Sequence, residues 1–287
     1  MGGAFFLYRP ALPVNLPPMA DTPHTLGIIA GNRTLPRILA REARTAGVQQ
    51  LVAAAFTDET EPELSELVDI IEWLRVGQLN KLVEVFQKNN VTQCVMVGQI
   101  APKNLFDLRP DLRAVKLLAS LPEKNAHSLF GGIADELAKD GITLIEATPW
   151  LKPAMPELGF QFGPEPTDDV RADIEYGLRI ARETSRLEIG QTVVVKNGTV
   201  LAVEGLEGTD ACLTRGGELA KGAVAVKIPK PGHDLRFDIP CLGARTLETC
   251  ASANIRALAF EAGRTLLLDE SEVDALAQRH GITLTAV

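Results

Sequence analysis

Short, fully apolar runs alternate with helical patterns through the first half of the 287-residue chain, and this alternation restricts the fold more than any other feature. Strands that are apolar throughout are buried on both faces, and strands that alternate with helices form parallel sheets covered by helices. The first half is therefore predicted to be a Rossmann-like α/β domain over residues 23–150. We expect strands at 24–30, 50–56, 70–76, 93–100 and 142–147, with helices over 34–47, 77–89, 113–120 and 129–140.

Gly31 and Asn32 follow the first predicted strand in the sequence GIIAGNRTLP. A Rossmann-type fold binds phosphate groups at this turn, between its first strand and first helix. The turn lacks a complete GxGxxG pattern, and the segment Phe56-Thr57-Asp58 is only a loose match to the acid that binds a ribose. Nucleotide contact at Gly31 and Asn32 and a plain strand-to-helix connection therefore both stay open, and NAD redox chemistry has little support.

A proline-rich stretch separates the two halves of the chain. Residues 148–167 contain five prolines, which is typical of an interdomain linker, and we assign residues 151–167 to it. Its large apolar residues predict that it packs across the domain boundary. Residues 168–287 are expected to form a mixed α/β catalytic domain, with a helix over 168–188 and a hairpin whose strands (191–195, 199–204) meet at Asn197-Gly198. Further helices are predicted over 212–221, 246–262 and 271–279, and strands over 223–228 and 264–268.

Composition excludes several classes of protein. A formal net charge of −8 argues against nucleic-acid binding. The four cysteines form no CxxC pair and the four histidines lack ligand spacing, so a disulfide framework and a zinc site are both disfavoured. No apolar run reaches the roughly 18–20 residues of a membrane span. Residues 1–22 do not have the pattern of a signal peptide and are expected to be a disordered extension of a cytoplasmic protein.

The stretch from Glu204 to Arg245 combines carboxylates, cations and tight turns. In HDLRFDIP, an extended backbone would place Asp234, Arg236 and Asp238 on one face. Carboxylate oxygens suit Mg²⁺, and a guanidinium clamps phosphate oxygens. An ordinary ion-pair ladder on an exposed strand explains the same pattern equally well. Two lysines nearby would take negative charge that develops on a phosphate: Lys227 and Lys230.

A glycine-containing turn follows the predicted hairpin. Gly205 would let the backbone approach a ligand closely, with Glu204 and Thr209 on either side. Asp210 is a candidate metal ligand in this turn, but it is equally suited to cap the helix that follows.

The sequences VVVKNGTVLAVEGLEGTDACL and KIPKPGHDLRFDIPCLG resemble the C-terminal domain of LpxI-type UDP-2,3-diacylglucosamine pyrophosphatases, and IIAGNRTLP resembles the N-terminal segment of that family. The likeness runs from about Leu26 onward. It implies Mg²⁺-dependent hydrolysis, with Mn²⁺ as a substitute, of UDP-2,3-diacylglucosamine to UMP and 2,3-diacylglucosamine 1-phosphate (lipid X) in lipid A biosynthesis. It also implies a peripheral protein at the cytoplasmic face of the inner membrane.

The resemblance, taken together with the chemistry of the residues, suggests roles for the residues above. An essential aspartate maps to Asp238 first and to Asp234 second, with Lys227 as a further catalytic residue. The metal would be held by Asp238, Asp234 and Asp210. Substrate contacts are expected from Gly31, Asn32, Glu204, Gly205, Thr209, Lys230 and Arg236. The sequence departs from the family pattern at His233, usually glutamine, and at Asn32 and Arg33, usually glycines. A homodimer is compatible with the sequence, and a nucleotide-sugar or lipid binding protein without turnover is the alternative.

Overall fold

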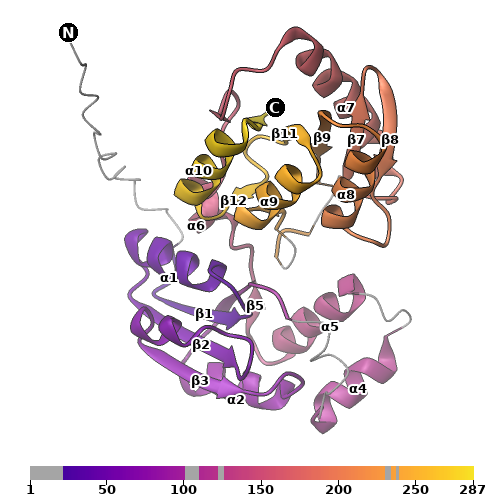
Figure 1. Cartoon of the computed structure of the whole chain (residues 1–287). Helices are drawn as coiled ribbons and strands as arrows, with labels where there is room; N and C mark the ends of the chain where they lie inside the picture. The colour runs from indigo at the N-terminus through magenta and orange to yellow at the C-terminus, as the bar shows by residue number, and fades with distance from the viewer. Residues whose placement is uncertain (1–21, 101–109, 122–125, 230–233, 237–238) are drawn as a thin grey trace, which may run out of the picture.

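The chain forms two α/β units, which lie one above the other in Figure 1. The structure is a computed structural model that describes residues 22–100, 110–121, 126–229, 234–236 and 239–287. The extension predicted over residues 1–22 lies outside the described residues up to residue 21. None of the helices in the described ranges combines the length and the apolar character needed to cross a bilayer.

The N-terminal unit contains a five-stranded sheet in the order β3-β2-β1-β4-β5, and every neighbouring pair is parallel. The Rossmann-like parallel sheet predicted from the sequence is therefore confirmed. The strands are β1 (Thr25–Ala30), β2 (Gln50–Phe56), β3 (Ile70–Leu74), β4 (Gln93–Val97) and β5 (Thr143–Leu144). Chain order reverses between β1 and β4, the kind of position where open α/β sheets bind their ligands.

Helices cover both faces of this sheet, because successive residues of a buried strand point to opposite sides. Ile28 packs in a cluster with residues of α1 (Leu35–Thr45) and α6 (Thr148–Leu151). Its neighbour Ile29 packs in a second cluster with residues of the helices on the other face. These helices are α2 (Leu79–Lys88), α4 (Leu112–Ser120) and α5 (Ala126–Lys139).

The C-terminal unit has a six-stranded mixed sheet in the order β6-β13-β11-β9-β7-β8. Its strands are β6 (Gln161–Phe162), β7 (Thr192–Lys196), β8 (Thr199–Val203), β9 (Ala223–Lys227), β11 (Ile255–Phe260) and β13 (Thr283–Ala286). One face packs against α7 (Asp168–Arg186). The other face packs against α8 (Thr209–Leu219), α9 (Ala244–Ser252) and α10 (Glu270–His280). The mixed α/β fold expected for this half is confirmed.

The predicted hairpin at Asn197-Gly198 is confirmed, and a buried aspartate on α7 stabilises its turn. Both residues have positive φ, 49° and 70°, as the tight turn requires. The buried carboxylate of Asp173 on α7 accepts hydrogen bonds from the backbone N–H groups of Asn197 and Gly198, each at 2.9 Å. The hairpin is thereby tied to the helix that covers it.

The prediction of one helix over residues 246–262 is wrong. The helix α9 ends at Ser252, Asn254 follows in the left-handed region with φ 55°, and Ile255–Phe260 is the buried strand β11. A fully apolar run such as IRALAF carries no period that separates a buried strand from a buried helix. The strand predicted over 264–268 shortens to β12 (Leu266–Leu267), which pairs with β10 (Cys241–Leu242) in a separate two-stranded sheet. The strand β13 was not predicted.

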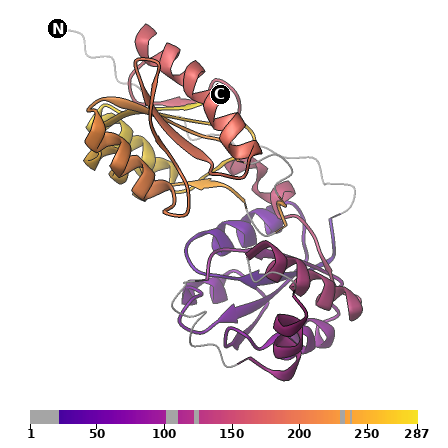
Figure 2. The same cartoon turned by 90° about the vertical axis from the view of Figure 1, so that its right-hand side faces the viewer.

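Apolar contacts join the two units. Trp150, Leu151 and Met155, from the proline-rich stretch, are buried in one cluster with Leu266 of β12. The same stretch then supplies β6, which pairs with β13 in the C-terminal sheet. The connection between the units, seen from the side in Figure 2, is therefore packed against both of them.

Candidate active site

The strands β8, β9 and β11 end at the same edge of the C-terminal sheet, because β7 runs antiparallel to both β8 and β9. This edge carries most of the residues selected from the sequence. It corresponds to the strand ends where α/β proteins place their ligands.

Glu204, Thr209 and Thr192 form a hydrogen-bonded group at this edge. The Thr209 hydroxyl lies 3.2 and 3.3 Å from the two carboxylate oxygens of Glu204 and 3.3 Å from the hydroxyl of Thr192. Gly208 precedes α8 with φ 83°, so the helix begins at Thr209 rather than at Cys212 as predicted. The group therefore presents a carboxylate and two hydroxyls beside the positive end of a helix dipole.

Lys227 lies next to this group. It ends β9, and it is paired in register with Thr192 on β7. Its ammonium donates to the carbonyl oxygen of Cys241 at 3.4 Å, and the residue is half-buried. Among the described residues this long hydrogen bond is the one given for the Lys227 ammonium, which has three donors in all.

Asp210 was predicted to be a metal ligand or a helix cap, and in the structure it pairs with an arginine. Its carboxylate lies 3.0 Å from the guanidinium of Arg245, in the first turn of α9, and both side chains are exposed. Gly208, not Asp210, occupies the cap position of α8. The pair links the starts of two helices at the site edge, and such an exposed ion pair contributes little stability.

Asp234 and Arg236 bind each other. Arg236 donates through Nε at 2.9 Å and through Nη2 at 2.6 Å to the two carboxylate oxygens of Asp234, and its backbone N–H donates to the same carboxylate at 3.1 Å. The chain turns at residues 235–236, so the extended segment predicted for HDLRFDIP is wrong over residues 234–236. A carboxylate that accepts from its own loop closes the loop locally, which an extended segment does not allow.

Arg236 also faces the N-terminal unit. The hydrogen bond that Arg236 donates to Asp234 raises the pKa of Arg236, and the charges of Asp135 on α5 and of Glu146 after β5 act in the same direction. Two acids of the other unit therefore lie within electrostatic reach of this turn. Neither Asp135 nor Glu146 was predicted as a site residue, since neither belongs to a motif.

In the N-terminal unit, Gly31 and Asn32 lie at the end of β1, as predicted. The backbone of Gly31 packs so closely on Gln99 that a Cβ would lie 2.5 Å from its carbonyl oxygen. Asn32 donates from Nδ2 to Glu59 at 2.7 Å, and Glu59 is only 7% exposed. The Asn32 Oδ1 atom is buried without a hydrogen bond from the described residues. Sequence reasoning considered Asp58 for the acid here and missed Glu59, its neighbour.

Two predicted residues, Asp238 and Lys230, lie outside the described residues. Within the described ranges, no three or more His, Cys, Asp or Glu side chains are grouped as metal ligands. Cys94, Cys212 and Cys250 are buried, Cys241 is half-buried, and all four are reduced.

A Rossmann-like unit joined to a mixed α/β unit, with carboxylates, hydroxyls and a lysine at one edge of the second sheet, defines the class of two-domain α/β proteins. The model of the LpxI N-terminal domain matches residues 25–154, and that of the LpxI C-terminal domain matches residues 157–285. The chain is 31% identical to the UDP-2,3-diacylglucosamine pyrophosphatase LpxI of Caulobacter vibrioides over 276 residues, which cover 91% of this chain and 97% of the relative. The chain belongs to the LpxI family, and it is an enzyme of that family.

Proposed function

We propose that the chain hydrolyses the pyrophosphate bond of UDP-2,3-diacylglucosamine, giving UMP and 2,3-diacylglucosamine 1-phosphate, in lipid A biosynthesis. The observation that carries this proposal is the likeness to a pyrophosphatase of that name, which extends over both domains and nearly the whole of each chain. A substrate with a nucleotide, two phosphates and acyl chains needs contacts from more than one unit, and the polar groups described above come from both.

The nucleotide end of the substrate is proposed to bind at the end of β1. Buried polar atoms without partners are costly, and Asn32 Oδ1 is such an atom beside the buried carboxylate of Glu59. Ribose hydroxyls donate to both kinds of oxygen, as they do to the acid of dinucleotide-binding folds. Gly31 keeps the turn close to Gln99, so that Asn32 is held at the strand end.

The phosphates are proposed to bind at the edge of the C-terminal sheet. Lys227 has donors available at the end of β9, and the start of α8 provides backbone N–H groups beside Thr209 and Gly205. Arg236 would join them only by sharing its guanidinium with Asp234, so we assign it to holding the turn as well as to the phosphate. Lys230, in the loop after β9, is proposed as a further phosphate contact.

Mg²⁺ is proposed as the cofactor, and the donor chemistry at this edge fits it. Mg²⁺ is usually bound by one or two carboxylates together with substrate phosphates, rather than by a full cage of protein ligands. Asp238 remains the first candidate ligand. Asp234, the second, and Asp210 already pair with Arg236 and Arg245, so each would have to share its carboxylate between an arginine and the ion. When bound, the ion neutralises phosphate charge and lowers the pKa of a coordinated water.

Release of UMP from UDP-2,3-diacylglucosamine tests the proposal. We expect wild-type protein to release UMP in the presence of Mg²⁺ and to stop when EDTA is added, with recovery on adding excess Mg²⁺. Asp238→Ala is expected to lower turnover at least a thousandfold, with Asp274→Ala, an aspartate on α10, as the matched control. Tight binding of intact substrate without any UMP would refute hydrolysis and favour the binding-protein alternative. Turnover that persists in EDTA would refute the requirement for Mg²⁺ and leave the proposed hydrolysis in place.

A further inference from the structure

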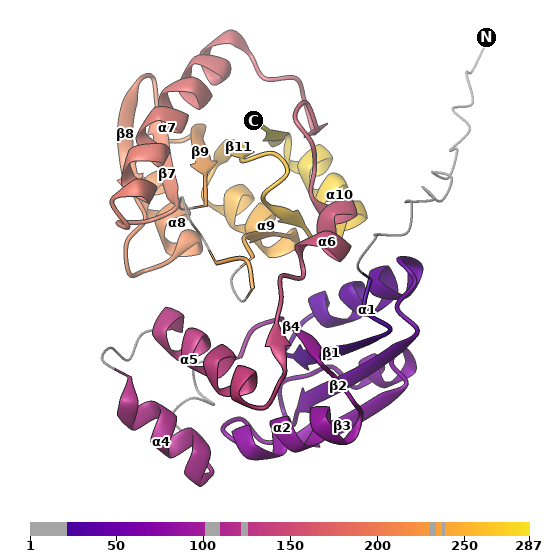
Figure 3. The ribbon, with the colours of Figure 1, turned by 180° about the vertical axis from the view of Figure 1, so that it is seen from behind.

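A buried hydroxyl lies behind the group formed by Glu204 and Thr209. Thr192 is the first residue of β7, and it is 0% exposed. Its side chain shares a face of the strand with that of Val194, which packs against Gly216 of α8. The helix lies beside β7 in Figures 1 and 3. The Thr192 hydroxyl therefore faces the start of α8, where the Thr209 hydroxyl lies 3.3 Å away.

The hydrogen bonds of this group can run in only one direction. An ionised carboxylate accepts hydrogen bonds and donates none, so the Thr209 hydroxyl donates to Glu204, whose two oxygens lie 3.2 and 3.3 Å from it. A hydroxyl has a single proton, so Thr209 contacts Thr192 as an acceptor. The Thr192 hydroxyl is therefore the donor across the 3.3 Å contact, and donation runs from Thr192 to Thr209 to Glu204.

The backbone of the sheet fixes where this chain of hydroxyls lies. The backbone N–H of Glu204 donates to the carbonyl oxygen of Thr192 at 2.8 Å. Lys227 is paired with Thr192 across β9 and β7, and residues directly opposite each other on neighbouring strands have their side chains on the same face. The hydroxyl chain and the Lys227 side chain therefore share the face of the sheet that meets α8.

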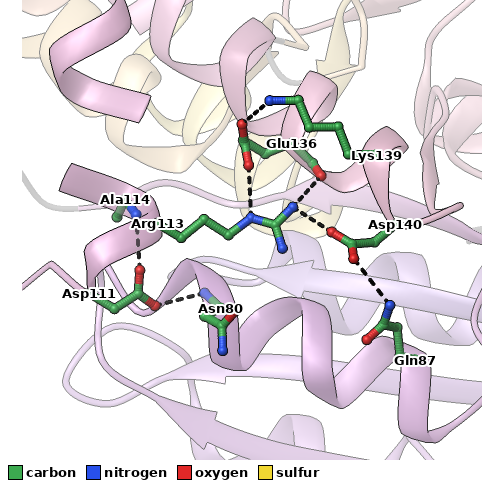
Figure 4. A network of polar contacts seen from close by, with 8 residues as sticks. All are labelled: Asn80, Gln87, Asp111, Arg113, Ala114, Glu136, Lys139 and Asp140. Carbon is green, nitrogen blue, oxygen red and sulfur yellow. Dashed lines mark hydrogen bonds and ion pairs between the residues drawn. The ribbon is translucent and has the colours of Figure 1, made fainter. Parts of the chain in front are cut away.

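Glu204 differs from nearby and distant carboxylates in the kind of partner it has. Its partner among the described residues is the Thr209 hydroxyl, whereas Glu207 lies 2.5 Å from the guanidinium of Arg215. In the N-terminal unit, Figure 4 shows Glu136 in the same kind of pair with Arg113, at 2.8 Å. A carboxylate has about four acceptor positions, so one that meets a single hydroxyl can accept from a further O–H group.

We propose that Thr192 is a positioning residue, which holds the Thr209 hydroxyl and, through it, the Glu204 carboxylate in one orientation beside Lys227. The proposal rests on the proposed function, in that the oriented carboxylate accepts from an O–H group of the UDP-lipid or of the water that hydrolyses it. A carboxylate that is already oriented in the free enzyme need not be ordered when the substrate reacts, and this favours turnover.

Thr192→Val tests the hydroxyl, because valine keeps the branched shape of threonine and the backbone hydrogen bonds of the strand. On UDP-2,3-diacylglucosamine we expect kcat/KM to fall about fivefold, the factor that one neutral hydrogen bond contributes. Thr192→Ser keeps the hydroxyl and is expected to restore kcat/KM to within about twofold of wild-type. A fall confined to kcat would assign the accepted O–H group to water, and a rise in KM would assign it to the substrate; both support the positioning role.

Thr283→Val is the matched control. Thr283 is also a buried threonine at the start of a strand of this sheet, and its hydroxyl donates to the carbonyl oxygen of Pro164 at 2.7 Å. Because β9, β11 and β13 are parallel, Thr283 lies at the opposite edge of the sheet from Lys227, which ends β9. We expect the control to change the urea midpoint about as much as Thr192→Val and to keep wild-type kcat/KM. Equal losses of kcat/KM in the two valine variants, or a serine variant no better than valine, would overturn the proposal.

A double-mutant cycle tests whether Thr192 acts through Thr209. Substitutions in one chain of hydrogen bonds are not additive, so adding Thr192→Val to Thr209→Val should change kcat/KM by less than about twofold. A further loss of about fivefold in the double variant would mean that Thr192 acts independently of Thr209, and would overturn the proposal.

The orientation of Thr209 can also be measured without turnover. Three-bond couplings across the Cα–Cβ bond of Thr209 should report one rotamer in wild-type protein and averaging among rotamers in Thr192→Val. Averaging already present in wild-type protein would overturn the proposal. If wild-type protein releases no UMP while the couplings change as expected, the proposed function fails and the positioning of Thr209 by Thr192 stands.

Discussion

Gly190→Ala is expected to disturb the candidate site by separating two loops. A Cβ at Gly190 would lie 2.0 Å from the carbonyl oxygen of Glu204 and 2.6 Å from its carbonyl carbon. Contacts under 3.0 Å are not found for real Cβ atoms, so the two backbones must move apart by about 1 Å. Gly190 is not among the glycines with positive φ, so this contact, and not backbone strain, decides the outcome.

The loss in the free energy of unfolding depends on the hydrogen bonds that the displaced Glu204 makes. The backbone N–H of Glu204 donates to the carbonyl of Thr192 at 2.8 Å, and the Glu204 side chain accepts from Thr209. Inserting a methyl into such a packed contact costs about 1–3 kcal/mol, and we expect about 2 kcal/mol here. Because the movement reaches Glu204 and Thr209, we also expect kcat for the UDP-lipid to fall about tenfold, which corresponds to about 1.4 kcal/mol of lost transition-state stabilisation.

Urea unfolding and steady-state kinetics check both parts. The control is Gly131→Ala on α5, because a Cβ there meets no atom within 4 Å. In a helix this control is expected to be neutral, or to stabilise the protein by up to about 1 kcal/mol. A Gly190→Ala variant with the wild-type urea midpoint and full turnover would refute the view that the contact between the loops positions Glu204.

Two further predictions concern charge and thiols. Lys139 and then Arg113 hold the pKa of Glu136 below its ordinary 4.5, so its contribution to stability is complete above pH 4.5 and is lost as the pH falls through the lower folded-state pKa. The rate of amide hydrogen exchange in α4 should rise in that acid range. In Glu136→Gln, exchange in α4 should already be faster at neutral pH and should no longer depend on pH. A wild-type exchange rate in α4 that does not change with pH would contradict this prediction. Burial raises the pKa of Cys94, Cys212 and Cys250 to about 12, so a thiol reagent should modify native protein at Cys241 alone. Labelling of all four at equal rates before unfolding would contradict it.

The N-terminal domain was predictable because its signals are local and agree with one another. Runs such as QLVAAAF are bounded by polar residues, and the helices between them have clear apolar stripes. The strands β1 to β5 and the helices α1, α2, α4 and α5 were therefore placed within a few residues, whereas α6 fell in the stretch predicted to be a linker. The hairpin at Asn197-Gly198 was equally clear, since only a tight turn with positive φ suits that pair. Local turn chemistry and period were sufficient in these places.

The errors come from segments whose structure is decided by distant neighbours. IRALAF becomes a strand because β9 and β13 flank it, and its sequence alone fits a buried helix as well. The strand β13, at residues 283–286, lies at the end of the chain and is fixed by pairing with β11 and β6. Pairing partners that are 26 residues or more away leave no periodic signal in either segment.

The pairing of charged side chains in the candidate site was likewise not predictable from the sequence. The sequence places Asp210, Asp234 and Arg236 in one stretch rich in turns, but it does not show which charge meets which. The structure gives Arg245 to Asp210 and Arg236 to Asp234, so two of the three proposed metal ligands already have a cation beside them. Among the described residues of the stretch, Glu204 is the carboxylate that accepts only from a hydroxyl, at 3.2 and 3.3 Å from Thr209. A phosphate that binds Arg236 here must therefore compete with Asp234 for the hydrogen bonds of the guanidinium. The Asp234 carboxylate would lose part of its pairing just as the substrate brings its own negative charge to the site.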